Sequence, residues 1–232
     1  MSNENLGHHT SKRFDEDLER LRASILQMGG LAEEQLNQAI ASLVQGDLQL
    51  AALVIEEERQ INQLERLVDE NCSRILATRT PAASDLRLVI GILKTATDIE
   101  RIGDEGKKIA RLGIRLNSIE HPTQRLTELR HLGRSVANML HDTLDAFARH
   151  DADAALKVAH RDRLIDEEYE AIQRQNITFM MEDPRAIRRA LDVMWAVRAL
   201  ERIGDHAKNI CEHVIYIVRG KDVRHLPLEA PP

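Results

Sequence analysis

Two pairs of acidic residues in this sequence have a spacing that could hold a cation. Glu100 and Asp104 are four residues apart, and so are Glu201 and Asp205, because the motif Glu-Arg-Ile-Gly-Asp occurs twice. In an α-helix this spacing stacks two carboxylates on one face, where their repulsion costs about 0.2–0.5 kcal/mol. A cation that bridges the two carboxylates would remove this repulsion.

A similar pair of polar residues precedes each motif. Asp162 and Asp166 come before the second motif, and Glu58 and Asn62 come before the first. If the helices that carry these residues are neighbours, up to four oxygen-bearing side chains converge in each half of the chain. Hard oxygen ligands suit magnesium, calcium, manganese or iron, and zinc is also compatible with them. All eight residues are therefore candidate metal ligands.

A solvated acidic surface is the alternative interpretation of these residues. Lys107 and Lys208 each follow an aspartate by three residues, a spacing that allows ordinary ion pairs on a helix surface. The repetition of the motif also follows from simple duplication of one unit. Spacing alone therefore leaves open whether the acids bind metal.

Long segments with helical periodicity, separated by short breaks, position these acids. The breaks contain side chains whose oxygens suit helix N-caps, namely Asp47, Ser84, Thr123, Asp151 and Asp183. The predicted helices span residues 12–45, 48–79, 84–117, 124–149, 152–181 and 184–219.

The third and sixth predicted helices each carry an apolar seam, whose members alternate between spacings of three and four residues. The seams consist of Leu88, Ile92, Thr95, Ile99, Ile102, Gly106, Ile109, Gly113 and Leu116, and of Val193, Ala196, Leu200, Ile203, Ala207, Ile210, Val214 and Ile217. The motif carboxylates fall away from the centres of these seams, so we expect them to face outward. Trp195 is expected to pack among helices or, alternatively, to anchor a contact. Met180 and Met181 are expected to fill the end of a bundle.

The second half of the sequence repeats the first. Residues 47–65 align with residues 151–169, and the two Glu-Arg-Ile-Gly-Asp motifs align with each other. We therefore predict an all-α fold of two tandem three-helix bundles, built from six long antiparallel helices. The bundles are expected within residues 1–120 and 121–225, followed by an irregular tail over residues 226–232.

The composition excludes several functional classes. The 232 residues carry a net charge of −6 without a basic block, which disfavours direct binding of nucleic acid. Cys72 and Cys211 lie far apart and form no Cys-x-x-Cys motif, which is typical of a reducing compartment. Because the N-terminus is polar and no apolar stretch reaches about 18 residues, we predict a cytoplasmic protein.

Catalytic motifs are missing from the sequence. It contains no glycine-rich phosphate loop, no nucleophile elbow and no nucleophile beside a base. Glu128 and His131 form one Glu-x-x-His motif, but a di-iron carboxylate bundle requires two. The sequence therefore predicts a protein that is not an enzyme.

Several motifs give the sequence a specific resemblance to a known family. They lie at residues 81–87 and 97–104, at residues 139–142 and 144–149, before the last helix at residues 182–183, and at its end at residues 216–220. From about Phe14 to His225 the sequence resembles the PhoU family. The resemblance implies two similar three-helix bundles, often in a homodimer, that act as a negative regulator of the phosphate-starvation regulon.

The resemblance also implies partners and metals. Members of the family are thought to link the ATPase subunit of the phosphate ABC transporter to a sensor histidine kinase, so that they meet the membrane through these partners only. Some members bind multinuclear iron or zinc clusters at E(D)xxxD motifs, which correspond here to Glu100 with Asp104, Glu201 with Asp205, and Asp162 with Asp166. Glu58 with Asn62 departs from this motif because an amide offers an oxygen without charge. We therefore expect the first site to bind cations more weakly.

Two further functional classes are alternatives to a binding adaptor. A metal-storage or redox bundle needs inward-facing carboxylates with paired histidines, whereas we expect these carboxylates to face outward. A DNA-binding repressor is disfavoured by the net charge of −6 and by the lack of a helix-turn-helix. The leading prediction is an adaptor that connects a transporter with a signalling kinase.

Overall fold

The computed structural model describes residues 12–118 and 126–224, and within these ranges the chain consists of helices joined by short connections, without a β-strand. The elements are α1 (Lys12–Gln45), α2 (Leu48–Arg79), α3 (Ala83–Asn117), α4 (Thr127–Arg149), α5 (Ala152–Ala159), α6 (Asp162–Glu182), the 3-10 helix η1 (Pro184–Ala186) and α7 (Ile187–Arg219). The predicted all-α fold class is confirmed. The predicted tail over residues 226–232 lies outside the described residues.

Aspartates cap three of these elements, as the sequence predicts. Asp47 accepts hydrogen bonds from the first backbone N–H groups of α2, Asp151 does so at α5, and Asp183 caps η1. The prediction for Ser84 is wrong, because the backbone N–H of Leu86 already donates to the carbonyl of Ala82 (2.8 Å) and α3 starts at Ala83. The predicted cap Thr123 lies outside the described residues.

The fifth predicted helix, residues 152–181, is interrupted. The backbone N–H of Arg161 donates to the carbonyl of Val158 (2.9 Å), and that of Leu164 donates to the carbonyl of Arg161 (2.9 Å). Such bonds over three residues tighten the backbone and end the regular α-helix. The side chain of Arg161 also donates to Asp142 of α4 (2.5 Å), which holds the turn against the bundle. As a result, Asp162 is the first residue of α6.

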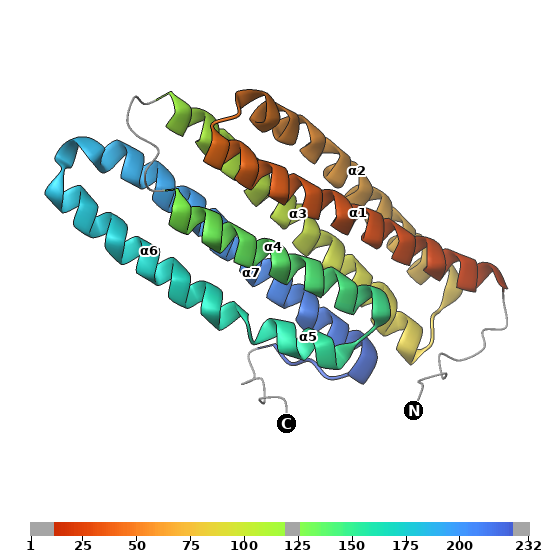
Figure 1. Ribbon diagram of the computed structural model, residues 1–232. Helices are drawn as coiled ribbons and strands as arrows, with labels where there is room; N and C mark the ends of the chain where they lie inside the picture. The colour runs from red at the N-terminus through yellow and green to blue at the C-terminus, as the bar shows by residue number, and fades with distance from the viewer. Residues whose placement is uncertain (1–11, 119–125, 225–232) are drawn as a thin grey trace.

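The helices pack in two layers. One layer is a row in which α2 packs against α3, α3 against α7, and α7 against α6. In the second layer, α1 covers α2 and α3, α4 covers α7 and α6, and α1 and α4 touch each other. Figure 1 shows α1 and α4 in front, with α2 and α6 at opposite edges of the molecule. Among the described residues, no helix covers the face of the row that points away from α1 and α4, and we call it the open face.

The predicted apolar seams form the centre of the core. Every seam residue of α3 and of α7 is buried, as are Cys72 and Cys211. Two glycines permit close approach of the helices: a Cβ atom on Gly113 would lie 3.1 Å from Cα of Leu43, and one on Gly91 would lie 2.5 Å from the side chain of Ile217. Aliphatic seams and small residues therefore determine how α3 packs on α1 and α7.

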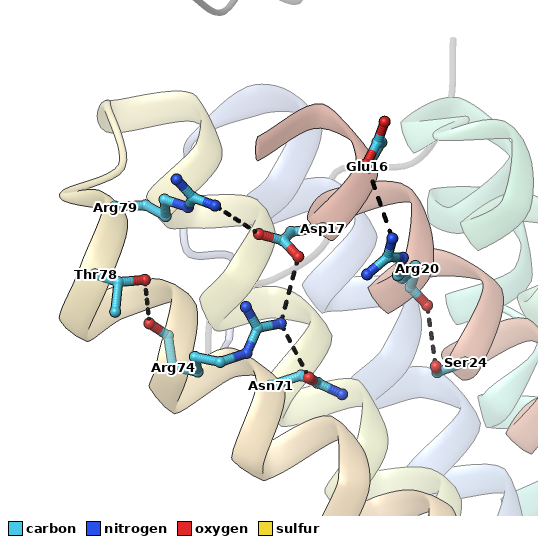
Figure 2. Close-up of polar contacts among 8 residues, drawn as sticks. All are labelled: Glu16, Asp17, Arg20, Ser24, Asn71, Arg74, Thr78 and Arg79. Atoms are coloured by element: carbon cyan, nitrogen blue, oxygen red, sulfur yellow. Dashed lines mark hydrogen bonds and ion pairs between the residues drawn. The ribbon is translucent and has the colours of Figure 1, made fainter. Parts of the chain in front are cut away.

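A buried carboxylate fastens the start of α1 to the end of α2. Asp17 is 6% exposed, and its carboxylate forms ion pairs with Nη2 of Arg74 and with Nη2 of Arg79, each at 3.4 Å (Figure 2). Arg74 also donates to the side-chain oxygen of Asn71 (3.1 Å), which orients its guanidinium (Figure 2). Two arginines thus compensate one buried charge at this end of the bundle.

Two predictions about apolar residues are wrong. Trp195 is 59% exposed and Met181 is 80% exposed, so that neither packs in the interior. Trp195 lies on the stripe of α7 that belongs to the open face, and Met181 lies near the end of α6, where no helix covers it among the described residues. Within the described residues, no helix combines the length and the hydropathy needed to cross a bilayer.

Candidate functional site

The first cluster of predicted site residues forms between α2 and α3. Glu58 is almost fully buried, and it accepts hydrogen bonds from Nζ of Lys107 (2.7 Å) and from Nδ2 of Asn62 (2.7 Å). The carboxyl of Asp104 also lies within hydrogen-bonding reach of Glu58, and Glu100 lies one helical turn before it. The expected convergence of Glu58, Asn62, Glu100 and Asp104 is therefore found in the structure.

The second cluster forms between α6 and α7 at the matching place. Asp162 is almost fully buried and accepts a hydrogen bond from Nζ of Lys208 (2.7 Å). Glu201 accepts one from Nη1 of Arg198 (2.7 Å), and the electric fields of both Asp166 and Asp205 act on it. Four carboxylates therefore meet here, together with one lysine and one arginine.

Burial and mutual repulsion shift the protonation of these acids. In the second cluster, burial and then the charge of Asp205 raise the pKa of Glu201 to about 7. Burial together with neighbouring carboxylates also raises the pKa of Asp166 and Asp205. Part of the second cluster therefore holds protons near neutral pH.

In the first cluster the same effects raise the pKa of Glu100 and of Asp104. Glu58 behaves differently: burial favours its neutral form, but hydrogen bonds from Lys107 and Asn62 outweigh this and lower its pKa. The inner carboxylate of the first cluster is therefore kept ionised by its partners.

The predicted outward orientation holds for only some of the acids. Asp104 and Asp205 are exposed, and Glu100 and Asp166 are half-buried. Glu201 is only 8% exposed, so the prediction that it faces outward is wrong. A single-helix projection locates the seam of α7, but it does not show that α6 packs beside the seam and covers Glu201. Each cluster thus has a buried inner part and a solvated rim on the open face.

The clusters have the chemistry of a hard-cation site without the complete geometry of one. The atoms that could ligate a cation are oxygens. Within the two clusters, three buried oxygens have no hydrogen-bond partner among the described residues: Oδ1 of Asn62, Oδ1 of Asp162 and Oε2 of Glu201. However, lysine ammonium groups already neutralise the inner carboxylates. Among residues 12–118 and 126–224, no three acidic, histidine or cysteine side chains are arranged to ligate one metal ion. Metal binding therefore stays a prediction.

Sequence reasoning overlooked a fourth acid in the first cluster. The carboxylate of Glu65 lies close enough to Glu100 to help raise its pKa. Glu65 follows Glu58 by two helical turns, so its spacing could have revealed it. The aligned position in the second repeat is Tyr169, whose ring lies 5.6 Å from the guanidinium of Arg198. Glu65 therefore adds a negative charge beside Glu100.

Sequence reasoning also overlooked a buried polar cluster between the two repeats. Asp98 of α3 binds Nδ1 of His206 (2.9 Å), Nε2 of His213 (2.9 Å) and Nδ2 of Asn209 (3.2 Å), all on α7. Although burial opposes ionisation, these hydrogen bonds lower the pKa of Asp98 to about 2. An ionised carboxylate only accepts hydrogen bonds, so each histidine donates through the named nitrogen.

A cleft of about 1090 Å³ opens beside the second cluster. Asp166, Asp205 and Lys208 line it together with Arg224, which follows the end of α7. The rim of the second cluster is therefore accessible to solvent and to binding partners.

The structure contains two bundles with matching carboxylate clusters. The protein therefore belongs to the class of proteins that are built from two copies of one helical domain. The family model described as "PhoU domain" matches residues 25–113 and, a second time, residues 129–214. The chain therefore belongs to the PhoU family, and the predicted resemblance is confirmed.

Relatives match the chain over nearly its whole length. The "Phosphate-specific transport system accessory protein PhoU homolog" of Pseudomonas putida is 55% identical over 229 residues, which cover 99% of this chain and 90% of the relative. The "Phosphate-specific transport system accessory protein PhoU" of Escherichia coli (strain K12) is 46% identical over 226 residues, 97% of this chain and 93% of the relative.

Solved structures share the fold. The crystal structure of PhoU from Pseudomonas aeruginosa matches with a TM-score of 0.87 and 53% identity, over 90% of this chain and 100% of that chain. The phosphate transport system regulatory protein PhoU from Streptococcus pneumoniae matches with a TM-score of 0.84 and 33% identity, over 90% of this chain and 99% of that chain.

Proposed function

We propose that this protein is a regulatory accessory protein of a phosphate-specific transport system. The observation that carries the proposal is the match to relatives of that name across both repeats, which reaches 55% identity over 99% of this chain. Two helical repeats packed against each other, with polar clusters on one open face, suit a protein that works by binding others.

The finer proposal is a cytoplasmic adaptor, acting as a homodimer, between the ATPase subunit of the phosphate ABC transporter and the sensor histidine kinase. Through this adaptor, abundant phosphate represses the phosphate-starvation regulon and restrains uptake. Such a protein shifts the equilibrium between two states of a partner only to the extent that it binds one state more tightly than the other. The two clusters differ in charge and protonation, which supports two partner surfaces with different preferences.

Deletion of the gene that encodes this protein, in its own organism, tests the regulatory role. A reporter driven by a phosphate-starvation promoter should become active at high phosphate and return to repression when the wild-type chain is restored. Co-purification at high and low phosphate tests the finer proposal, because the kinase and the ATPase subunit should both bind, with affinities that depend on phosphate. Unchanged repression after removal would overturn the regulatory role, and failure to bind either protein would overturn the adaptor.

We propose in addition that the second cluster binds a cation, with iron, zinc, manganese and magnesium as candidates. The unpartnered buried oxygens of Asp162 and Glu201 favour this second proposal. Elemental analysis of protein purified without a histidine tag tests it, with Glu201→Gln/Asp205→Asn as the variant that should lose the metal. Equal metal content in wild type and variant would contradict the proposal. Stoichiometric iron with oxidase activity would instead support a storage or redox bundle.

A further inference from the structure

An apolar surface lies exposed where α6 and α7 meet at η1. Five side chains form it: Ile177 (48% exposed), Met181 (80%), Ile187 (41%), Leu191 (44%) and Trp195 (59%). Single exposed apolar residues are common, but a group of five large ones usually marks an interaction site. We call this group the Trp195 face.

Helical spacing arranges the Trp195 face as two adjoining stripes. Ile187, Leu191 and Trp195 follow one another at intervals of four residues along α7, and Ile177 and Met181 do so along α6. The two helices pack against each other and both contact η1, so the stripes lie side by side at this end of the molecule. Figure 1 shows α6 and α7 running together to their shared turn at the left.

The first repeat has a much smaller apolar surface at the matching positions, where only Leu86 (38%) is a large exposed apolar side chain. Its aligned positions hold Ser73 and Ala77 on α2, and Leu86, Ile90 and Lys94 on α3. The ammonium of Lys94 lies 5.7 Å from the ring centroid of Tyr216, so this position contacts the second repeat. The Trp195 face is therefore a property of the second repeat and not a requirement of the shared fold.

Positive charge surrounds the Trp195 face, although the whole chain has a net charge of −6. Residues 184–198 contain four arginines and one acid. That acid, Asp192, is already neutralised by Arg115 of α3 (2.5 Å). Arg185 pairs with Asp183 (3.3 Å) and Arg198 with Glu201 (2.7 Å), so the positive charge left unpaired among the described residues comes from Arg188 and Arg189. Arg188 lies exposed between Ile187 and Leu191 and has no ion-pair partner among the described residues. A binding partner that carries negative charge beside its apolar side chains would therefore complement this surface.

We propose that the Trp195 face is the docking site for an amphipathic helix of a partner protein whose apolar stripe is flanked by Asp and Glu. Tryptophan, methionine and arginine are enriched in the cores of protein interfaces, and two neighbouring helices form a shallow seat for a third. The α7 stripe continues through Arg198 to the exposed Asp205 of the second cluster. An anionic bilayer would meet those acids, whereas a protein helix can avoid them.

This inference rests on the proposed adaptor function, because it names the chemistry of one partner surface. Two probes test it with the full-length chain: the purified ATPase subunit and the cytoplasmic part of the sensor kinase, both from the same organism. Trp195→Ala should weaken binding of one of them about tenfold, since truncation of a central tryptophan removes a large part of an interface. Arg188→Glu should weaken the same complex and reduce its salt dependence. Leu67→Ala is the matched control, because Leu67 is 52% exposed on α2 and should leave binding unchanged.

A photo-reactive phenylalanine analogue at position 195 identifies the occupant directly. The cross-linked peptide, read by mass spectrometry, should be an amphipathic segment with acidic flanks in the same partner. Cross-links only to a second copy of this chain would overturn the proposal. Trp195-dependent binding to vesicles of phosphatidylethanolamine and phosphatidylglycerol, without a protein cross-link, would also overturn it.

The results separate this inference from the adaptor proposal. If wild type binds a probe and Trp195→Ala binds it equally well, the docking site is wrong and the adaptor stands. If wild type binds neither probe, the adaptor itself is wrong, and the docking site fails with it.

Discussion

The two repeats share one scaffold, but their carboxylate clusters differ in charge. In the first, Lys107 and Asn62 both donate to the buried Glu58 and lower its pKa. In the second, one oxygen of the buried Asp162 has no partner among the described residues, and the pKa of Glu201 rises to about 7. Duplication therefore preserved the positions of the acids, whereas single substitutions around them changed how tightly each cluster holds protons or cations.

The largest effect on stability is expected at the junction between the repeats. Asp98→Ala removes the carboxylate that binds His206 and His213, so the free energy of unfolding should fall by about 3 kcal/mol. The aligned residue in the second repeat is already Ala199, so this change makes the two repeats alike at this position. Urea denaturation at pH 7 measures the effect.

Asp98→Asn is the matched control for that variant, because its amide keeps one acceptor, and it should lose less stability. In the wild type, the low pKa of Asp98 stabilises the fold fully above pH 4, and this contribution should disappear as pH falls towards 2. No loss of stability in Asp98→Asn would show that the charge of Asp98 is unimportant.

Removal of the lysine partners of the buried carboxylates should distinguish the clusters. Lys208→Met leaves Asp162 without its partner and should cost about 2–3 kcal/mol of unfolding free energy. Lys107→Met should cost less, because Asn62 still donates to Glu58. Thermal and urea denaturation of both variants measure the difference. Equal losses would contradict the view that the first cluster is the better satisfied.

The raised pKa of Glu201 predicts a stability that depends on pH. The folded protein binds this proton more tightly than the unfolded chain, so stability is full below about pH 4.5 and falls as pH rises through about 7. Glu201→Gln should therefore be more stable than wild type at pH 8 by about 2 kcal/mol, and this advantage should vanish near pH 4. Denaturation across this range measures it. Glu100→Gln is the aligned change in the first cluster and should give a smaller gain in stability at pH 8. An equal gain would contradict the view that the two clusters differ in protonation.

The smallest change in stability is expected from substitution of the acids at the rims of the clusters. The effect of such substitutions on gene regulation should nevertheless be large. Glu100→Ala/Asp104→Ala should alter the unfolding free energy by less than about 1 kcal/mol, because Asp104 is exposed and both acids are repelled by neighbours. The variant should still derepress phosphate-starvation genes at high phosphate. Glu201→Ala/Asp205→Ala tests the aligned acids of the second cluster, one buried and one on the rim, in the same reporter strain. Normal repression in both variants would show that neither acidic rim contributes to regulation.

Most of the fold could be predicted because helical periodicity is local and recurs in the sequence. The seams of α3 and α7 and the Asp47 and Asp151 caps follow from spacing and are confirmed. The break before Asp162 could not be predicted, because residues 160 and 161 carry no glycine or proline signal. It depends on the contact between Arg161 and Asp142 of another helix.

The sequence by itself determined the helical class, the duplication, the seams and the pairing of acids four residues apart. Only the tertiary structure decided that Glu201 is buried beside α6, that Asp98 joins the repeats through His206 and His213, and that Trp195 lies exposed. The physical reason is that spacing along one helix determines which residues share a face. Burial, protonation and hydrogen bonding depend instead on which other helix covers that face.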